Sequence, residues 1–371
     1  MNNRERTLAI LNYEEYDRMP VVHFGYWNET LEKWANEGHI RMELAKGWHD
    51  GSDADLELDK VFGWDFNWSR TVGGNNGLKP PFERKVLKER EDGGFEVMDG
   101  NGAIILEKPG AGSIPAEIDH LLKTREAWEE LYLPKLQWSM DRIPAWILDP
   151  PKKWAERDAP VAVHVGSLLG TIRNWIGVVN LSYMMADDPE LLEEIIQTVA
   201  DITYQNLKTI LEANDDFDYA HYWEDISFKN GPLVSPRFFR KKVGPYYQRN
   251  ADLLNEHGIT LTSLDSDGNI DKLVPIWLEN GVNIMFPIEV GTWKASIAPW
   301  REKYGRELRG VGGMNKVVFS RDRQAIDEEV ERLRQLVDLG GYIPCPDHRI
   351  APDAKFDNVI YYVERMHHVF G

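Results

Sequence analysis

The chain has 371 residues, of which 42% are hydrophobic and 28% charged, a composition typical of a globular protein with one large domain or two smaller ones. Its 43 lysines and arginines against 61 aspartates and glutamates give a formal net charge of −18, which argues against nucleic acid or an anionic membrane as the main partner. The single cysteine, Cys345, excludes an intramolecular disulfide and a cysteine-rich zinc site. Residues 1–6 hold no apolar signal segment, and no run approaches the ~18 apolar residues of a membrane span, so we expect a cytoplasmic protein.

The first part of the chain combines helical stretches with one short strand. Residues 4–12 have helical spacing, and an apolar, β-branched and aromatic strand follows at 21–27. Two further helical stretches are expected at 28–36 and 40–46.

The region from residue 69 to 109 has a different character. Turn pairs such as Gly73-Gly74 and Asn101-Gly102 separate short runs of residues typical of strands. This pattern predicts a β-ribbon or meander inserted before the main body.

Beyond residue 161 the pattern becomes regular, with buried-type strands followed by helical stretches. Strands are expected at 161–167, 217–223, 259–264, 282–288, 308–314 and 341–345. Helices are expected at 181–211, 236–255, 271–279, 293–304, 321–339 and 356–369.

This alternation indicates an α/β protein with a parallel sheet. With the strand at 21–27 it gives seven strands, and an eighth near Val61 or in the irregular region would complete a (β/α)8 TIM barrel. We therefore predict a single barrel domain over residues 1–371, with an N-terminal helical extension and the inserted ribbon. An open doubly wound sheet is the alternative, but no Gly-x-Gly-x-x-Gly turn follows the first strand.

Titratable or hydrogen-bonding residues follow nearly every predicted strand. In a parallel barrel the carboxyl ends of the strands share one face, so these residues would meet there. They are His23, Tyr26, His164, Tyr222, Glu224, Asp225, Asp265, Asp267, Glu289, Asn315, Lys316, Asp347, His348 and Arg349. The recurrence indicates a functional site at this face, although each member alone has a structural explanation.

The stretch from Leu261 to Ile270 is the most informative of these strand ends. In an extended chain Asp265 and Asp267 project to the same side, with their carboxylates about 6 to 7 Å apart. Two such carboxylates repel each other, raise one pKa or share a cation, or else they cap the following helix. With Asp225, Glu289 and two histidines nearby, the cluster suits either a divalent cation or a carboxyl group that serves as general acid.

Several stretches taken together resemble one known family. They are Arg18-Met19-Pro20-Val21, Tyr222-Trp223-Glu224-Asp225, Gly231 to Phe239, Asp265-Ser266-Asp267-Gly268-Asn269, Gly312 to Lys316, and Gly341 to Pro344 with Asp347-His348 and Pro352. This set resembles the uroporphyrinogen decarboxylase-like superfamily over nearly the whole chain. The resemblance implies a (β/α)8 barrel and one of two activities, decarboxylation of a porphyrinogen or methyl transfer between small donors or thiols and a corrinoid carried on a separate protein.

The sequence departs from both branches of that superfamily. The decarboxylases carry an arginine-rich loop after the first strand, where this chain has residues 23–27, His-Phe-Gly-Tyr-Trp, so a polycarboxylate would meet an acidic site. The thiol-methylating members hold zinc through a His-x-Cys pair and a distant Cys. The matching positions here are Asp265, Asp267 and His348, a ligand set that suits a harder divalent metal, or zinc held more weakly.

Three hypotheses follow. The first is a corrinoid-dependent methyltransferase that acts on a small methylated substrate with a corrinoid protein as partner, either as a monomer or as a homodimer. In it Glu224, Asp225, Glu289 and His164 are catalytic, and Asp265, Asp267 and His348 hold a metal. The substrate-binding residues would be His23, Tyr26, Trp27, Tyr222, Trp223, Asn315 and Arg349. The second is a decarboxylase or lyase of the same superfamily that acts on a small carboxylic acid, and the third is a non-catalytic binding module.

Overall fold

The computed structural model describes residues 1–108 and 115–371, apart from the side chain of Lys153. Parallel strands form a closed barrel, as predicted. The strands of the barrel are β1 (Val22–His23), β2 (Phe66–Asn67), β3 (Thr71–Val72), β8 (Ala162–Gly166), β9 (Tyr219–Trp223), β12 (Thr262–Asp265), β13 (Ile284–Phe286), β14 (Arg309–Met314) and β15 (Tyr342–Pro346). Strand β1 pairs with β2, and β3 pairs with β8, from which the sheet continues in chain order to β15. Strands β2 and β3 are two pieces of one strand position, which lies between β1 and β8.

Strand β15 lies beside β1 and closes the circle. The Ile350 N–H donates to the Gly25 carbonyl at 3.0 Å, and the Trp27 N–H donates to the Ile350 carbonyl at 3.1 Å. The barrel therefore has eight strand positions. The eighth lies at Phe66–Val72, close to Val61 and reaching into the irregular region, as predicted, whereas Val61 itself belongs to α4 (Asp53–Phe62).

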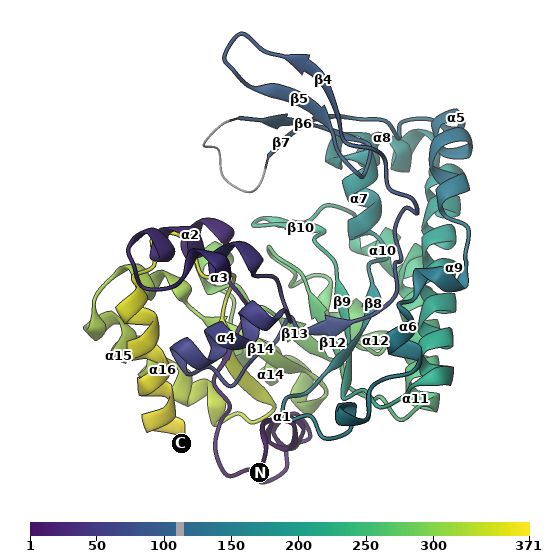
Figure 1. Cartoon of the computed structure of the whole chain (residues 1–371). Helices are drawn as coiled ribbons and strands as arrows, with labels where there is room; N and C mark the ends of the chain where they lie inside the picture. Colours follow the sequence, from purple (N-terminus) through teal and green to yellow (C-terminus); the bar gives the residue numbers. More distant parts are fainter. Residues whose placement is uncertain (109–114) are drawn as a thin grey trace.

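Helices surround this barrel (Figure 1). Those before the ribbon are α1 (Asn3–Leu11), α2 (Asn28–Asn36), α3 (Met42–Gly47) and α4 (Asp53–Phe62). The later ones are α5 (Arg125–Ala127), α6 (Ala145–Leu148), α7 (Gly170–Ile176), α8 (Val178–Asp187), α9 (Pro189–Ala213), α10 (Pro236–Lys242), α11 (Gly244–Glu256), α12 (Val274–Glu279), α13 (Val290–Trp293), α14 (Ile297–Tyr304), α15 (Arg323–Val337) and α16 (Phe356–Phe370).

Two long helices predicted from periodicity are each divided in two. The predicted helix 181–211 breaks at Asp188, whose side chain accepts a hydrogen bond from the Leu191 N–H at 3.0 Å, with Pro189 as the first residue of α9. Both features are typical of a helix start, so the chain ends α8 and begins α9 there. The predicted helix 236–255 likewise breaks at Val243, before Pro245.

The inserted ribbon consists of four antiparallel strands, β4 (Lys85–Glu89), β5 (Phe95–Met98), β6 (Ala103–Glu107) and β7 (Ala116–His120). It stands apart from the barrel at the top of Figure 1, whereas both termini lie at the opposite end. The predicted ribbon, 69–109, therefore began too early, because Thr71–Val72 belongs to the barrel, and it missed β7. Its predicted last residue, Pro109, lies outside the described residues.

The interior of the barrel is a packed apolar core. It includes Val22, Phe66, Trp68, Tyr219, Ile284, Phe286, Ile343 and Cys345. The thiol of Cys345 is fully buried, and burial raises its pKa well above the ordinary value. Gly312 in β14 has a φ of +124°, and a Cβ atom there would lie 1.5 Å from the carbonyl oxygen of Pro287, so only glycine fits this position.

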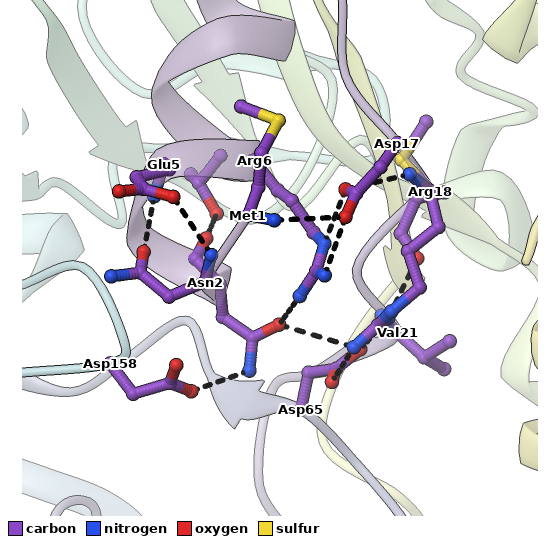
Figure 2. Close-up of polar contacts among 12 residues, drawn as sticks. Met1, Asn2, Glu5, Arg6, Asp17, Arg18, Val21, Asp65 and Asp158 are labelled. Atoms are coloured by element: carbon purple, nitrogen blue, oxygen red, sulfur yellow. Dashed lines mark hydrogen bonds and ion pairs between the residues drawn. The ribbon is translucent and has the colours of Figure 1, made fainter.

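Helix α1 and the segment after it are fixed to the amino end of the barrel by ion pairs (Figure 2). Arg18 donates two hydrogen bonds of 2.7 Å to the Asp65 carboxylate, which also accepts the Val21 N–H at 2.8 Å. Burial alone would raise the pKa of Asp65, but these hydrogen bonds hold it below its ordinary value. Arg6 forms a second such pair with Asp17. Among the described residues, no helix is both long and apolar enough to cross a membrane.

Candidate functional site

Four strand ends bring an acidic cluster together at the carboxyl face of the barrel. Asp225 follows β9, Asp265 ends β12 and Asp267 lies two residues later, while Glu289 follows β13 and His348 follows β15. Asp267 lies at the centre of this cluster. Its N–H donates to Asp225 Oδ1 at 3.1 Å, and its Oδ2 lies 3.1 Å from His348 Nε2. The structure thus brings together residues from 225 to 348 that the sequence had predicted to meet.

The carboxylates of the cluster perturb one another. Burial and the charge of Asp267 raise the pKa of Asp225 to about 6. Burial, Asp267 and Asp225 raise the pKa of Asp265 well above its ordinary value, and burial and Asp267 also raise the pKa of Glu289. A carboxyl group with a pKa near neutrality is suited to donate and accept protons.

His348 is held at this cluster by two aromatic neighbours and by the hydrogen bond of its Nε2 atom. Its ring stacks on Trp27, with centroids 5.4 Å apart and an interplanar angle of 19°, and lies 5.6 Å from the ring of Phe24. Within the part of the chain that the structure describes, His348 Nδ1 and Asp267 Oδ1 are buried and have no hydrogen-bond partner. Buried polar atoms normally have a partner, so these two mark a place where a ligand, an ion or water would be expected.

Glu289 is partly engaged by the backbone. Its Oε2 accepts the Gly268 N–H at 2.5 Å, and its Oε1 accepts the Thr292 hydroxyl at 2.8 Å. Glu289 therefore fixes the turn after Asp267 and closes one side of the cluster.

Glu224 lies next to Asp225 in sequence but is built into the wall of the barrel. Its fully buried carboxylate accepts hydrogen bonds from the backbone N–H groups of Leu168, Leu169 and Gly170 at the start of α7, and from the hydroxyls of Ser167 and Tyr247. Burial raises its pKa, and these hydrogen bonds oppose that effect. The arrangement gives Glu224 a structural task, the anchoring of the first turn of α7.

His164 on β8 faces His221 on β9 in the barrel interior, with ring centroids 6.1 Å apart. Burial lowers the pKa of His164 to about 4, and burial and His164 together lower that of His221 to about 3. Both imidazoles are therefore neutral near pH 7. His221 was not predicted, although it lies two residues after Tyr219 in β9 and therefore on the same face of that strand as Tyr219.

Three further residues that were predicted to bind substrate lie in three different parts of the barrel. Tyr222 is buried, accepts a hydrogen bond from Asn250 Nδ2 at 3.0 Å and packs on Tyr247, so it belongs to the wall. Trp223 is half-buried. Asn315 caps the next helical turn through Oδ1, which accepts the Val317 N–H at 3.2 Å.

A pocket of about 300 Å³ opens beside His348. It is lined by Tyr26, Trp27, Asn28, Trp48, His49, Asp50 and Arg349. Arg349 donates to both carboxylate oxygens of Asp50, at 2.6 and 3.3 Å, and its guanidinium lies 5.3 Å from the ring of Trp48. Asp50 was not predicted, because it lies in a loop between α3 and α4 with no strand pattern to mark it. The pocket combines aromatic walls with hydrogen-bonding groups, as small-molecule sites do.

His23 lies deeper, beneath this pocket, and is fully buried. With Asp55 and Asp59 it forms a group whose ligand atoms lie within 4.8 Å of one another. The Gly25 N–H donates to His23 Nδ1 at 3.0 Å, so the proton resides on Nε2, which lies 2.7 Å from Asp59 Oδ1. A protonated nitrogen cannot ligate a metal, and the group is therefore better described as a hydrogen-bonded triad that supports the pocket.

The residues Asp265, Asp267 and His348 offer two carboxylates and an imidazole. This donor chemistry and the unpartnered Asp267 Oδ1 fit a divalent cation. Among the described residues, however, these three do not place three ligand atoms within 4.8 Å of one another, and Asp267 bonds directly to His348. The set fits a cation by its chemistry, and binding would require the Asp267–His348 hydrogen bond to open.

Comparisons with known proteins agree with this fold. A family model described as uroporphyrinogen decarboxylase (URO-D) matches residues 139–369, more than half of the chain. Among solved structures, a methyltransferase from Methanosarcina mazei is similar, with 16% identity, 99% of each chain covered and a TM-score of 0.61. A B12-independent methionine synthase from Shewanella sp. W3-18-1 aligns over 95% of this chain and 96% of its own, with 11% identity and a TM-score of 0.47. No curated protein matches the chain. The chain belongs to the uroporphyrinogen decarboxylase (URO-D) family.

Proposed function

We propose that this protein is a methyltransferase that passes the methyl group of a small methylated substrate to a corrinoid carried by a partner protein. The observation that carries the proposal is the cluster of Asp225, Asp267 and His348 at the carboxyl face, with the pKa of Asp225 at about 6. The full-length likeness in fold to a methyltransferase supports it.

The chemistry of demethylation explains why such a cluster is useful. A corrinoid on the partner protein would supply the nucleophile that takes the methyl group, and the electron pair of the broken bond would stay on the oxygen or nitrogen of the substrate. That leaving group needs a proton, and a positioned acid with a pKa near the working pH supplies it most effectively. Asp225 is assigned this role, because burial and the charge of Asp267 raise its pKa and keep a proton available near neutrality.

The other residues are assigned supporting roles. If the Asp267–His348 contact opened, Asp265, Asp267 and His348 would hold a divalent cation, which would stabilise negative charge on the leaving heteroatom in place of a proton from Asp225, because its charge would lower the pKa of that carboxyl. Glu289 positions the turn after Asp267, Glu224 anchors the start of α7, and His164 with His221 keeps the interior beside the cluster uncharged.

The substrate would enter through the pocket beside His348. Trp27, Tyr26 and Arg349 line this pocket directly. His23 is assigned to the support beneath this pocket. Tyr222 is assigned to the barrel wall, Asn315 to the turn after β14, and the half-buried Trp223 to the end of β9.

The test is formation of methylcobalamin, followed by its absorbance, from cob(I)alamin and a panel of methyl ethers and methylamines. We expect one class of donor to react with the wild type and the rate to fall at least about 100-fold in both Asp225→Asn and His348→Gln. His368→Gln is the matched control, because His368 is exposed in the last turn of α16 and does not belong to the cluster. No product from any donor with the wild type, or equal rates in all variants, would overturn the proposal.

A decarboxylase or lyase acting on a small carboxylic acid is the second candidate. It is favoured by the family model and by the two cations at the mouth, Lys316 and Arg349, which could hold one carboxylate. Release of carbon dioxide from a screened acid, abolished in Asp265→Asn, would support this activity over methyl transfer.

A further inference from the structure

The end of the barrel opposite the acidic cluster holds a group of arginines around one tyrosine. Tyr13 follows α1, which lies at the end of the barrel away from the ribbon (Figure 1). The guanidinium carbons of Arg301, Arg306 and Arg309 lie 5.2, 4.9 and 5.4 Å from the centroid of its ring. Three cations thus share one aromatic ring in a protein of net charge −18.

None of these three arginines forms an ion pair with a carboxylate in the part of the chain that the structure describes. Arg301 donates to the carbonyl oxygens of Leu339 and Gly340 at 2.8 and 2.9 Å. Arg309 donates to those of Leu11 and Glu307 at 2.5 and 3.2 Å. The exposed guanidinium of Arg306 donates no hydrogen bond to any described residue. Burial and the neighbouring guanidiniums lower the pKa of Arg301, as expected where positive charge is not neutralised.

The backbone at Tyr13 is held in an uncommon conformation that keeps the ring among the arginines. Tyr13 has a φ of +61°, in the left-handed region that side-chain-bearing residues seldom adopt. Its hydroxyl donates to the Arg306 carbonyl at 2.9 Å, which ties the ring to the segment that carries the cations. The arrangement is therefore pre-formed, with the positive charges placed before any ligand arrives.

A pocket of about 530 Å³ opens at this group, and it is lined by Tyr13, Leu278, Gly281, Asn283, Arg306, Glu307 and Arg309. Arg309 begins β14 and Asn283 precedes β13, so the pocket lies at the amino ends of the barrel strands. Glu307 contributes one carboxylate to the lining, against the guanidiniums of Arg306 and Arg309 and the nearby Arg301. The pocket is thus separate from the acidic mouth and opposite to it in charge.

We propose that this pocket binds a small dianion of the phosphate type, gripped by Arg306 and Arg309. Arginine suits this ligand, because its planar set of N–H donors matches the oxygens of a phosphate group. The phosphate group could belong to the free anion or to a phosphate monoester, and both share the chemistry that the guanidiniums recognise. The inference stands apart from the proposed function, since no residue of the acidic cluster takes part in it.

The test is isothermal titration calorimetry of the full chain with inorganic phosphate and, separately, with glycerol phosphate at constant ionic strength. We expect the dissociation constant to rise at least about tenfold in Arg306→Gln, because the anion loses one charged hydrogen-bonding partner. Arg306 is exposed, so this variant should fold, which circular dichroism would verify. Tighter binding of the ester than of the free anion would identify a phosphorylated small molecule as the ligand, and the reverse would identify the free anion.

The matched control is Arg323→Gln. Arg323 is also exposed and lies 4.7 Å from the centroid of the Tyr361 ring, and among the described residues it is the one arginine placed over that ring. It should leave phosphate binding unchanged. Failure of both probes to bind the wild type, or equal losses in the Arg306 and Arg323 variants, would overturn the inference.

Discussion

Replacing Asp225 with asparagine should make the protein more stable at neutral and alkaline pH while it impairs the proposed chemistry. The pKa of Asp225 rises from 3.8 to about 6 on folding, which at about 1.36 kcal/mol per pKa unit is a penalty of as much as about 3 kcal/mol on the ionised group. Asparagine removes the charge, and its Oδ1 can still accept the Asp267 N–H. We therefore expect the free energy of unfolding of Asp225→Asn to exceed that of the wild type by about 1 to 3 kcal/mol at about pH 8.

The sign of the pH dependence is fixed by the direction of this shift. A carboxyl group with a raised pKa binds a proton more readily in the folded state. Its destabilising effect on folding is therefore complete at pH values above its pKa in the folded state and vanishes at pH values below its pKa in the unfolded state. The advantage of Asp225→Asn should thus shrink as pH falls through about 6 and disappear near 3.8.

Urea unfolding of both proteins across this range measures the effect. Asp149→Asn serves as a control, because Asp149 is exposed and its replacement should change stability by less than about 0.5 kcal/mol. A difference between Asp225→Asn and the wild type that does not vary with pH, or a clear loss of stability at pH 8, would refute the reasoning.

Three further predictions concern the frame of the barrel, each measured by urea unfolding. Glu224→Gln should lower the free energy of unfolding by about 2 to 3 kcal/mol, because its amide nitrogen would face backbone N–H donors; an unchanged stability would contradict the anchoring role. Asp65→Asn should cost about 2 to 3 kcal/mol at pH 7 by leaving Arg18 without its partner, and this loss should narrow as pH falls below about 4, since the pKa of Asp65 is lowered by folding. Gly312→Ala should cost at least about 3 kcal/mol, because its methyl group would overlap the Pro287 carbonyl; a soluble variant of wild-type stability would show that this contact can relax.

The strands of the second half could be predicted because each is a short apolar run between helical stretches. The strand at Phe66–Val72 could be predicted only as a strand near Val61 or in the irregular region, since its two pieces have two residues each and the pattern of a continuous strand is absent. Helix breaks at Asp188 and Val243 were missed because apolar periodicity continues across both, and only the capping residue and the prolines marked them.

The candidate site was likewise predictable in part. The rule that parallel strands end at one face was enough to bring Asp225, Asp267 and His348 together from distant positions. The rule could not separate Glu224 from Asp225, because neighbouring residues at a strand end point in different directions and only the start of α7 decides which one is bound by backbone N–H groups. Asp50 bonds Arg349 from a loop, and no periodic pattern in the sequence marks a loop residue as the partner of a distant side chain.

The buried thiol of Cys345 gives this chain an internal reporter of opening. Because the side chain lies in β15 with no exposure and no second cysteine competes for reagent, an aromatic disulfide reagent can react only when that strand leaves its neighbours. The labelling rate of the native protein therefore measures how often the barrel wall separates at β15, without any denaturant and without an introduced probe. A variant or a ligand that tightens the closure between β15 and β1 would be recognised by slower labelling, even where its effect on the overall melting temperature is small.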